Sequence, residues 1–270
     1  MTPTTIKFTK MHGLGNDFMV IDAITETIEI DKLPIVQLSN RHLGVGFDQL
    51  LLINKGKTHD FSCRFFNSDG SEAEQCGNGV RCVARFLHEN NLLKGNSLSL
   101  ETKAGTVEIT IHDYDNIEVN MGKPGFSNSV RYQEYSFHCL AMGNPHAILQ
   151  VNRIDDFPVA ELGNSMQSLK DFPTGVNVGF IEIKNPDRIR LRTFERGVGE
   201  TFACGSNACA AVVTGIKHHH LKNKVTVELP LGHLTIEWHG ENHDVLMTGP
   251  ASRVYRGQIS GRVGSSLCNR

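Results

Sequence analysis

Hydrophobic positions recur along the chain with two different periods. Between residues 61 and 66, apolar and polar side chains alternate, which predicts a strand with one buried face. Between residues 78 and 90, apolar side chains return every three or four positions from Val80 to Leu87, which predicts a helix. Residues 208–216 are apolar on every side, and a helix of that composition is buried all round.

Further strands are expected on both sides of the first helix, and Pro34 predicts a short helix over residues 33–40. The expected strands cover residues 5–10, 18–21, 50–53, 97–102 and 106–111. A buried helix with strands before and after it is typical of an α+β domain. We therefore expect a curved antiparallel sheet, resembling a barrel, wrapped around a central helix.

The two halves of the chain repeat one another. Cys76 and Cys204 both open a helical pattern, and they are 128 positions apart. The same shift maps Gly15-Asn16 to Gly143-Asn144, Gln49 to Asn177, Phe66-Asn67 to Phe194-Glu195, and Glu72 to Glu200. A fixed offset at several separate places indicates a duplicated domain.

Past the cysteines, a shift of 127 aligns the halves instead. The pairs that it relates are Cys82 and Cys209, Ala84 and Ala211, Glu101 and Glu228, Gly105 and Gly232, and Ile109 and Ile236. We therefore expect a single deletion near Asn207.

The repeat predicts two homologous domains related by a pseudo-twofold axis. The first is expected over residues 1–121 and the second over residues 122–250. Residues 251–270 remain as a tail, which we expect to return to the first domain.

Composition narrows the class of protein. The 27 basic and 29 acidic residues nearly balance, which argues against nucleic-acid binding. The start of the sequence lacks the apolar core of a signal peptide, and no apolar run is long enough for a membrane span, so we expect no membrane association and a cytoplasmic location. In that reducing compartment, the seven cysteines are expected as free thiols.

A cysteine at the start of a helix lies beside outward-pointing backbone N–H groups, which favour a thiolate. If two such cysteines meet one substrate, the thiolate of one removes a proton and the thiol of the other returns a proton to the opposite face. The net result is inversion of a stereocentre. Using the same residue type on both sides suits a reaction that runs in both directions.

Side-chain amides and one ion pair are also tied to the repeat. Asn16, Gln49, Asn67, Asn144 and Asn177 offer both donors and acceptors, and the pair Glu195-Arg196 offers one charge of each sign. Together they are suited to holding the ammonium and carboxylate groups of an amino acid.

Five motifs closely resemble the diaminopimelate epimerase family. They begin at Met11 (MHGLGNDF), Arg41 (RHLGVGFDQ), Cys76 (CGNGVRC), Met142 (MGNPH) and Glu195 (ERGVGETFACGS). The resemblance implies an isomerase that interconverts LL- and meso-diaminopimelate in lysine and peptidoglycan-precursor synthesis. It also implies that neither pyridoxal phosphate nor any other cofactor or metal is used, that the enzyme is a homodimer, and that the active site lies between two barrel-like domains.

The resemblance assigns a role to individual positions. Cys76 and Cys204 match the proton-transfer pair, His146 and Glu195 match positions that adjust the thiols, and Tyr255 matches a dimer contact. The implied substrate contacts are Asn16, Gln49, Asn67, Gly77, Asn78, Asn144, Asn177, Glu195, Arg196, Gly205 and Ser206.

Two departures from the family pattern are visible. Asn207 stands where the family usually has glycine, and residues 126–139 are fewer than in many members. We expect altered packing at the second helix start with activity retained, and a changed surface connection.

Two alternatives remain open. One is a racemase of the same fold that acts on proline or hydroxyproline. The other is a redox or metal-binding module built on Cys204, Cys209 and the histidines at 218–220. Cysteines five residues apart do not share a helix face, which counts against the second alternative.

Overall fold

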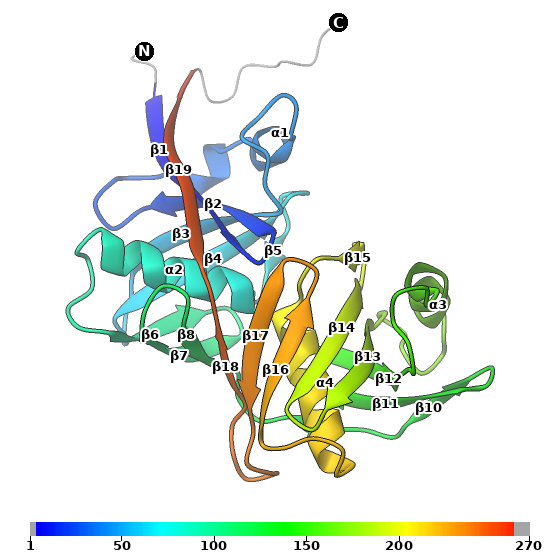
Figure 1. The fold of residues 1–270 in the computed structure, drawn as a ribbon. Helices are drawn as coiled ribbons and strands as arrows, with labels where there is room; N and C mark the ends of the chain where they lie inside the picture. The colour runs from blue at the N-terminus through cyan, green and yellow to red at the C-terminus, as the bar shows by residue number, and fades with distance from the viewer. Residues whose placement is uncertain (1–3, 262–270) are drawn as a thin grey trace, which may run out of the picture. The chain divides into compact units, whose positions relative to one another are not determined.

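The computed structural model describes residues 4–261, which form two compact units (Figure 1). Unit 1 contains residues 4–114 and 251–261, and unit 2 contains residues 115–250. The expected boundary after residue 121 differs from this division, because β8 (Ile117–Asn120) pairs with β18 (Leu246–Gly249) of unit 2. Residues 1–3 and 262–270 of the expected first domain and tail lie outside the described residues.

Unit 1 is a mixed sheet packed on helix α2 (Gly77–Glu89). Its strands follow the order β19-β1-β2-β3-β4-β6-β7, and β5 pairs with β4. The bounds are β1 Thr4–Gly13, β2 Asn16–Asp22, β3 Gln49–Lys55, β4 Phe61–Asn67, β5 Glu72–Ala73, β6 Ser97–Thr102, β7 Gly105–Ile111 and β19 Ser252–Gly261. Two short elements, η1 (Ile30–Lys32) and α1 (Ile35–Ser39), lie between β2 and β3.

Unit 2 repeats this arrangement around helix α4 (Gly205–Lys217). Its strands follow the order β10-β11-β12-β13-β14-β16-β17-β18-β8, with β9 on β11 and β15 on β14. The remaining bounds are β9 Gly125–Phe126, β10 Val130–Tyr132, β11 Tyr135–Ala141, β12 Pro145–Gln150, α3 Val159–Met166, β13 Asn177–Asn185, β14 Arg188–Glu195, β15 Gly199–Thr201, β16 Lys224–Leu229 and β17 Gly232–Glu237.

The α+β class is confirmed, but the sheets are mixed and not purely antiparallel. In unit 1 the pairs β2–β3 and β4–β6 are parallel, and in unit 2 the pairs β12–β13 and β14–β16 are parallel. Each of these pairs is joined by a connection that contains a helix. A crossover of that kind brings the chain back to the same end of the sheet, so the next strand runs parallel.

Both faces of the central strands are buried. In β3, Leu50 and Leu52 pack with Ile35 of α1, whereas Leu51 lies on the α2 side, beside Gly79. Burial on both faces explains why β3 is a continuous apolar run without alternation. Helix α4 likewise contacts strands from β11 to β18, which explains its apolar character on all sides.

The two central helices correspond residue for residue at a shift of 128. Each has 13 residues and a cysteine as N-cap. They also end in the same turn, in which Asn91 and His219 adopt positive φ angles of 55° and 60°. The shift becomes 127 at the following strands, where β6 begins at Ser97 and β16 begins at Lys224.

The deletion therefore lies in the loop after the helix, and its expected place near Asn207 is wrong. Cys82 and Ala84 correspond to Ala210 and Val212, not to Cys209 and Ala211. Helix α4 is almost uniformly small and apolar, so neighbouring positions offer similar residues and the sequence alone misplaced the gap.

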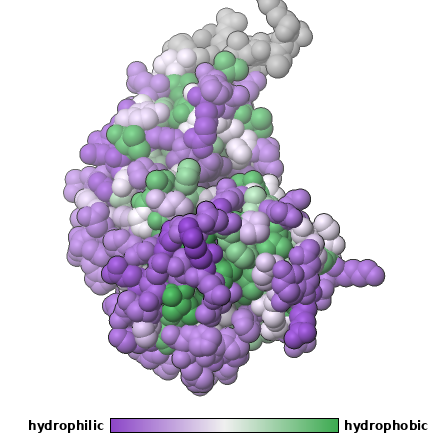
Figure 2. Space-filling view, turned by 45° about the vertical axis from the view of Figure 1, so that its right-hand side comes forward, coloured by the Kyte–Doolittle hydropathy of each residue, from purple (hydrophilic) through white to green (hydrophobic). Residues whose placement is uncertain are grey.

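The surface is mostly hydrophilic on the face shown in Figure 2, with hydrophobic residues in separate patches. Within residues 4–261, no helix is long and apolar enough to cross a membrane.

Candidate active site

Cys76 and Cys204 have the same backbone geometry at the starts of α2 and α4. Cys76 is extended, with φ −143° and ψ 116°, and Cys204 has φ −126° and ψ 113°. Each carbonyl accepts the first helical hydrogen bond, from Val80 at 2.8 Å and from Ala208 at 3.0 Å. Each cysteine is the N-cap residue, so its side chain stands at a helix N-terminus, which carries a partial positive charge.

In unit 1, two predicted substrate contacts lie beside Cys76. Asn16 Oδ1 is 3.4 Å from Cys76 Sγ and accepts a hydrogen bond of 3.3 Å from Asn78 Nδ2. Asn16 Nδ2 donates to Asp48 Oδ2 at 2.9 Å, which fixes the direction of the amide. The oxygen of Asn16 is therefore turned toward the cysteine.

Gln49 and Asn67, two further predicted contacts, bind each other across the adjacent strands β3 and β4. Gln49 Nε2 donates to Asn67 Oδ1 at 2.9 Å, and Asn67 Nδ2 donates to Ser71 Oγ at 3.0 Å. Gln49 Oε1 is buried and has no partner among the described residues. A buried acceptor without a donor is costly, so this oxygen is suited to a ligand N–H group.

Arg81 supports this half-site and was not predicted. Its side chain is fully buried, and Nη2 donates to Asn78 Oδ1 at 2.9 Å, while Nη1 lies 3.5 Å from Gly77 O. Arg81 thereby holds Asn78 in place. Its signal in the sequence was a single charge inside the apolar run around Val80.

A charged network behind Asn16 was also missed. Arg41 donates to both oxygens of Asp17 at 2.9 Å and to Asp48 at 2.7 Å, and Lys10 donates to Asp17 at 2.5 Å. Burial alone would raise the pKa of Asp17, but the hydrogen bonds from Arg41 and Lys10 outweigh it and lower that pKa to about 2. The network fixes Asp48 and, through it, the amide of Asn16.

In unit 2, Cys204 is buried and its Sγ is 3.5 Å from Ser206 Oγ. Burial raises the pKa of the Cys204 thiol well above its ordinary value, and the nearby Glu195 carboxylate raises it further. Hydrogen bonds from Ser206 and from the Asn207 backbone oppose these effects without cancelling them. Glu195 is held by a hydrogen bond from Thr201 Oγ1.

The predicted contacts Asn177 and Arg196 also lie together. The backbone N–H of Arg196 donates to Asn177 Oδ1 at 3.0 Å, and Asn177 Nδ2 is 3.4 Å from Pro145 O. The guanidinium of Arg196 is 3.4 Å from Thr174 O. Asn177 thus links the loop that carries Arg196 to the start of β12.

His146 contacts another predicted substrate residue. Its side chain is 1% exposed, and Nε2 is 2.8 Å from Asn144 Oδ1. Burial lowers the pKa of His146 to about 3, so the ring is neutral at physiological pH. Its described hydrogen bond runs to Asn144 and not to a sulfur.

The three amide positions of unit 1 differ from their counterparts in unit 2 by one charge. At the shift of 128, the carboxylate Glu195 corresponds to the neutral amide Asn67, whereas Asn16 and Gln49 correspond to the amides Asn144 and Asn177. Among these three pairs of corresponding positions, only one residue is a carboxylate, and it belongs to unit 2.

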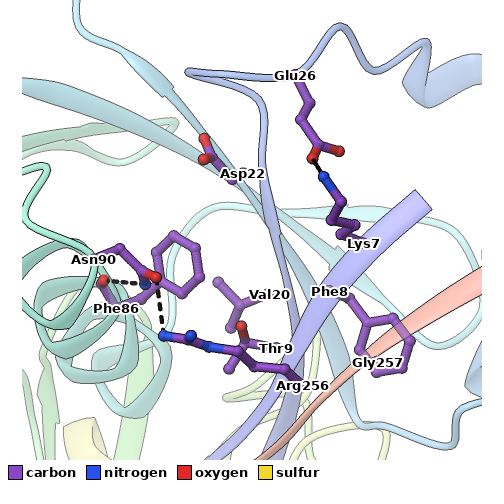
Figure 3. A pocket seen from close by; sticks show the side chains of 10 residues that line it. All are labelled: Lys7, Phe8, Thr9, Val20, Asp22, Glu26, Phe86, Asn90, Arg256 and Gly257. Atoms are coloured by element: carbon purple, nitrogen blue, oxygen red, sulfur yellow. Dashed lines mark hydrogen bonds and ion pairs between the residues drawn. The ribbon is translucent and has the colours of Figure 1, made fainter. Parts of the chain in front are cut away.

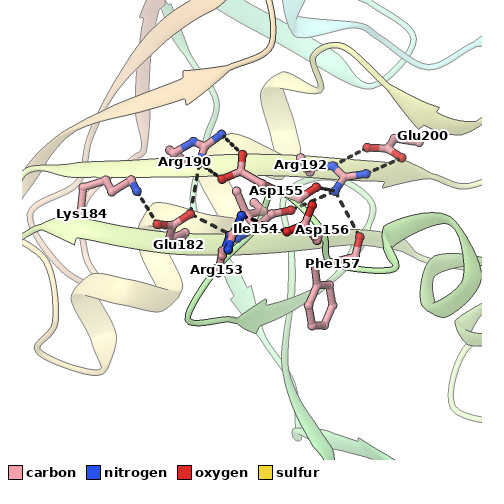
Figure 4. Close-up of polar contacts among 10 residues, drawn as sticks. All are labelled: Arg153, Ile154, Asp155, Asp156, Phe157, Glu182, Lys184, Arg190, Arg192 and Glu200. Carbon is pink, nitrogen blue, oxygen red and sulfur yellow. Dashed lines mark hydrogen bonds and ion pairs between the residues drawn. The ribbon is translucent and has the colours of Figure 1, made fainter.

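Matching ion pairs brace the hairpin that precedes each cysteine. Arg64 binds Glu72 through two contacts of 2.9 Å, and Arg192 binds Glu200 at 2.7 and 3.0 Å. Arg192 also donates to the carbonyls of residues 154, 155 and 157, as Figure 4 shows. The pairs tie β4 to β5 and β14 to β15, and so fix the strands from which the chain enters each cysteine loop.

The other described cysteines are buried in the cores. Burial raises the pKa of Cys82 to about 12 and that of Cys139 to about 11, and Cys63 and Cys209 are also buried. Unlike Cys76 and Cys204, none of these four cysteines is the N-cap of a described helix. No group of three or more His, Cys, Asp or Glu side chains suited to a metal ion occurs within residues 4–261.

A pocket of 250 Å³ lies in unit 1 at the other end of α2 (Figure 3). Phe86 and Asn90 line it, together with residues of β1, β2 and β19. These two residues are ten or more positions from Cys76, which corresponds to about 15 Å along a helix. The pocket is therefore separate from the cysteine.

Comparisons with known proteins agree with the resemblance seen in the sequence. The family model described as diaminopimelate epimerase matches residues 8–127 and 138–254. The chain is 45% identical over 273 residues to the diaminopimelate epimerase of Ectopseudomonas mendocina, covering 94% of this chain and 99% of the relative. It is also 45% identical to that of Nitrosomonas europaea, covering 94% of this chain and 98% of the relative. The unmatched residues 128–137 fall in the segment that the sequence marks as short.

Solved structures show the same fold at low sequence identity. A PhzF-family phenazine biosynthesis protein of Bacillus anthracis aligns with a TM-score of 0.73 at 20% identity, covering 95% of this chain and 99% of that one. A hydroxyproline epimerase from Agrobacterium vitis, with bound trans-4-hydroxy-L-proline, aligns with a TM-score of 0.72 at 15% identity, covering 95% and 92%.

Proposed function

Because the chain belongs to the diaminopimelate epimerase family, we propose that it interconverts LL- and meso-diaminopimelate by a two-base cysteine mechanism without a cofactor. The family makes the chain an isomerase of the epimerase type. The proposal places it in lysine and peptidoglycan-precursor synthesis, in the cytoplasm and as a homodimer. One observation supports it above all: each unit presents a cysteine at the start of its central helix, beside the amide of an Asn or the hydroxyl of a Ser.

In the mechanism, one thiolate removes the α-proton, and the electron pair of the broken C–H bond passes to the carbon and its carboxylate. The thiol of the other cysteine then donates its proton to the opposite face, which inverts the centre. Backbone N–H groups at Gly77, Asn78, Gly205 and Ser206, in the first turns of α2 and α4, are placed to stabilise the developing negative charge. The reaction requires both helix starts to meet one substrate.

The two cysteines have different resting states in this mechanism. Burial and the Glu195 carboxylate favour the protonated form of Cys204. We therefore assign Cys204 as the resting thiol and Cys76 as the resting thiolate. A substrate whose α-proton faces Cys76 loses that proton to the thiolate and receives its new proton from Cys204.

The remaining predicted residues bind the substrate. The unpartnered Gln49 Oε1 is suited to an ammonium N–H, and Arg196 and Glu195 supply the charges that match a carboxylate and an ammonium. A substrate with an amino-acid group at each end uses this number of polar contacts, whereas proline leaves part of them without a partner. This favours diaminopimelate over the proline-type alternative.

Solvent isotope incorporation tests the proposal. When LL-diaminopimelate is incubated with the enzyme in deuterated water, deuterium should appear at the inverted α-carbon of the meso product without added pyridoxal phosphate. Cys76→Ala and Cys204→Ala should each reduce epimerisation by about 10²- to 10⁴-fold. Cys209→Ala is the matched control, because Cys209 is a buried thiol on the same helix as the proposed acid, and it should retain activity. Wild-type epimerisation in both of the first two variants would falsify the two-base mechanism.

A further inference from the structure

A buried polar cluster lies in unit 2, directly after the cysteine. Asn207, Thr193 and His146 are each at most 1% exposed, and Asn207 is in the first turn of α4. Asn207 Nδ2 donates to Val178 O at 3.0 Å and also to Thr193 Oγ1. Both protons of this amide are therefore used on β13 and β14, and its oxygen points elsewhere.

Two buried atoms of the cluster have no hydrogen-bond partner within the described residues. They are His146 Nδ1 and Asn207 Oδ1. The side chain of Asn207 lies close enough to the imidazole to act on it as a hydrogen-bonding group. With the proton on Nε2, both atoms are acceptors, so neither supplies the hydrogen that the other lacks.

Moving the proton to Nδ1 completes the cluster. In this tautomer His146 Nδ1–H is the donor that Asn207 Oδ1 lacks, and Nε2 is an acceptor for the amide group of Asn144, 2.8 Å away. The Asn144 amide must then turn its NH₂ toward the ring, an exchange of two ends of almost equal size. Each of the two unpartnered atoms then has a group of complementary hydrogen-bonding chemistry in the cluster, which fits the rule that buried polar atoms are paired.

The corresponding residue in unit 1 has this orientation. Asn16, which corresponds to Asn144 at the shift of 128, directs its NH₂ to Asp48 and its oxygen toward Cys76. In unit 2 the position of Asp48 is taken by Val176, which has no acceptor side chain. A neutral His146 with a free lone pair on Nε2 supplies the acceptor instead.

The positions in unit 1 that correspond to this polar cluster hold glycine and apolar residues. In unit 1 the positions that correspond to Asn207, Gly179, Thr193 and His146 are Gly79, Leu51, Phe65 and Phe18. A Cβ atom on Gly179 would lie 2.4 Å from Asn207 Oδ1, and one on Gly79 would lie 3.0 Å from Phe65. In unit 1 the glycine is on the helix and the large side chains are on the sheet. In unit 2 the glycine is on the sheet and the large side chain is on the helix.

We propose that Asn207 is a positioning residue which, through the Nδ1–H tautomer of His146, turns the oxygen of Asn144 outward to accept a hydrogen bond from the substrate ammonium group. An ammonium has only donors and a carboxylate has only acceptors, so the orientation selects the ammonium end. This inference deepens the proposed function and rests on it for the identity of the ligand. The tautomer itself does not depend on that function.

Nitrogen NMR of the full-length enzyme tests the tautomer directly. Long-range ¹H–¹⁵N correlation spectra of ¹⁵N-histidine-labelled protein distinguish a protonated Nδ1 from a protonated Nε2, and the signals lost in His146→Gln identify the ring. We expect His146 to be neutral from pH 6 to pH 8, about the physiological range, with its proton on Nδ1. A proton on Nε2 in the wild type would overturn the inference, whether or not the enzyme epimerises diaminopimelate.

Kinetics test the link to Asn207. Asn207→Gly should weaken the Nδ1–H preference of His146 and raise KM by roughly threefold to tenfold, the effect of one hydrogen bond, with a smaller change in kcat. Ala208→Gly is the matched control, since it adds a glycine at the next buried position of α4, and it should leave the tautomer and KM unchanged. An unchanged tautomer in Asn207→Gly would show that Asn207 does not set it. If the tautomer changes but no variant epimerises diaminopimelate, the proposed function fails and the positioning role stands.

Discussion

At the scale of single residues, one amide of unit 1 is replaced by a carboxylate at the corresponding position of unit 2. Glu195 acts on Cys204, whereas the corresponding Asn67 is neutral and binds Gln49. A duplicated domain begins with two equal thiols, and a two-base reaction needs one thiolate and one thiol at rest. In the proposed mechanism, the carboxylate at one of the two corresponding positions gives the thiols different roles.

The first prediction concerns this carboxylate. Glu195→Gln should lower the pKa of the Cys204 thiol, because the variant loses a negative charge that raises it. In a Cys76→Ala background, the profile of the Cys204 alkylation rate against pH should shift to lower pH. Glu161→Gln, on the exposed face of α3, should leave the profile unchanged. An identical profile for Glu195→Gln would exclude the charge as the cause.

At the scale of elements, the hydrogen bonds of the site depend on ion pairs between strands and loops. Arg41 and Lys10 hold Asp17, and Arg41 also holds Asp48, which directs Asn16. The Asp17 side chain is only 15% exposed, so these pairs are screened less than exposed ones. The network therefore links the stability of β1 and β2 to the geometry around Cys76.

The pH dependence of stability tests this network. The folded-state pKa of Asp17 is about 2, below its ordinary value of 3.8. Its contribution is therefore fully present above pH 3.8 and is lost as the pH falls toward about 2. Asp17→Asn should reduce the free energy of unfolding in urea by about 1 to 2 kcal/mol at pH 7, and the difference from wild type should narrow below about pH 4.

Asp156→Asn supplies the comparison. Its pair with Arg153 is exposed, at 79% and 73%, and should change stability little at any pH. A difference between Asp17→Asn and wild type that stays constant down to pH 3 would show that ionisation of Asp17 is not its source.

At the scale of the whole molecule, the proposed homodimer needs an interface, and we expect it at β19. In the described part of unit 1, β19 pairs with β1 alone, so its other edge carries free backbone donors and acceptors. Val254 and Tyr255 on this strand are 57% and 45% exposed, and the Tyr255 ring packs edge-on against Phe8 at 5.9 Å. An exposed apolar edge suits association with a like edge.

Substitution of Tyr255 tests the homodimer. Light scattering of the wild type should give twice the chain mass of 29.9 kDa, and Tyr255→Asp should shift the mass toward a single chain. Leu231→Asp changes an exposed apolar residue of unit 2 and should leave the mass unchanged. A monomeric wild type, or a Tyr255→Asp variant of unchanged mass, would exclude this interface.

Local patterns in the sequence determined the central helices, most strands and the two cysteines at helix starts. Helical spacing and turn residues depend on neighbours within a few positions, so they are visible without a structure. The 128-residue repeat extended these local predictions to the second unit, including the amides at matching positions.

Only the tertiary structure decided which distant groups meet. The parallel pairs β2–β3 and β4–β6, the burial of Arg81 and the cluster of Asn207 with His146 all join residues far apart in the chain. Such contacts follow from how crossovers and packed faces fill space, which no short window of sequence contains. The misplaced deletion has the same explanation. The strand pairing that follows each central helix shows where the shift changes from 128 to 127, and the residue types within the helix do not.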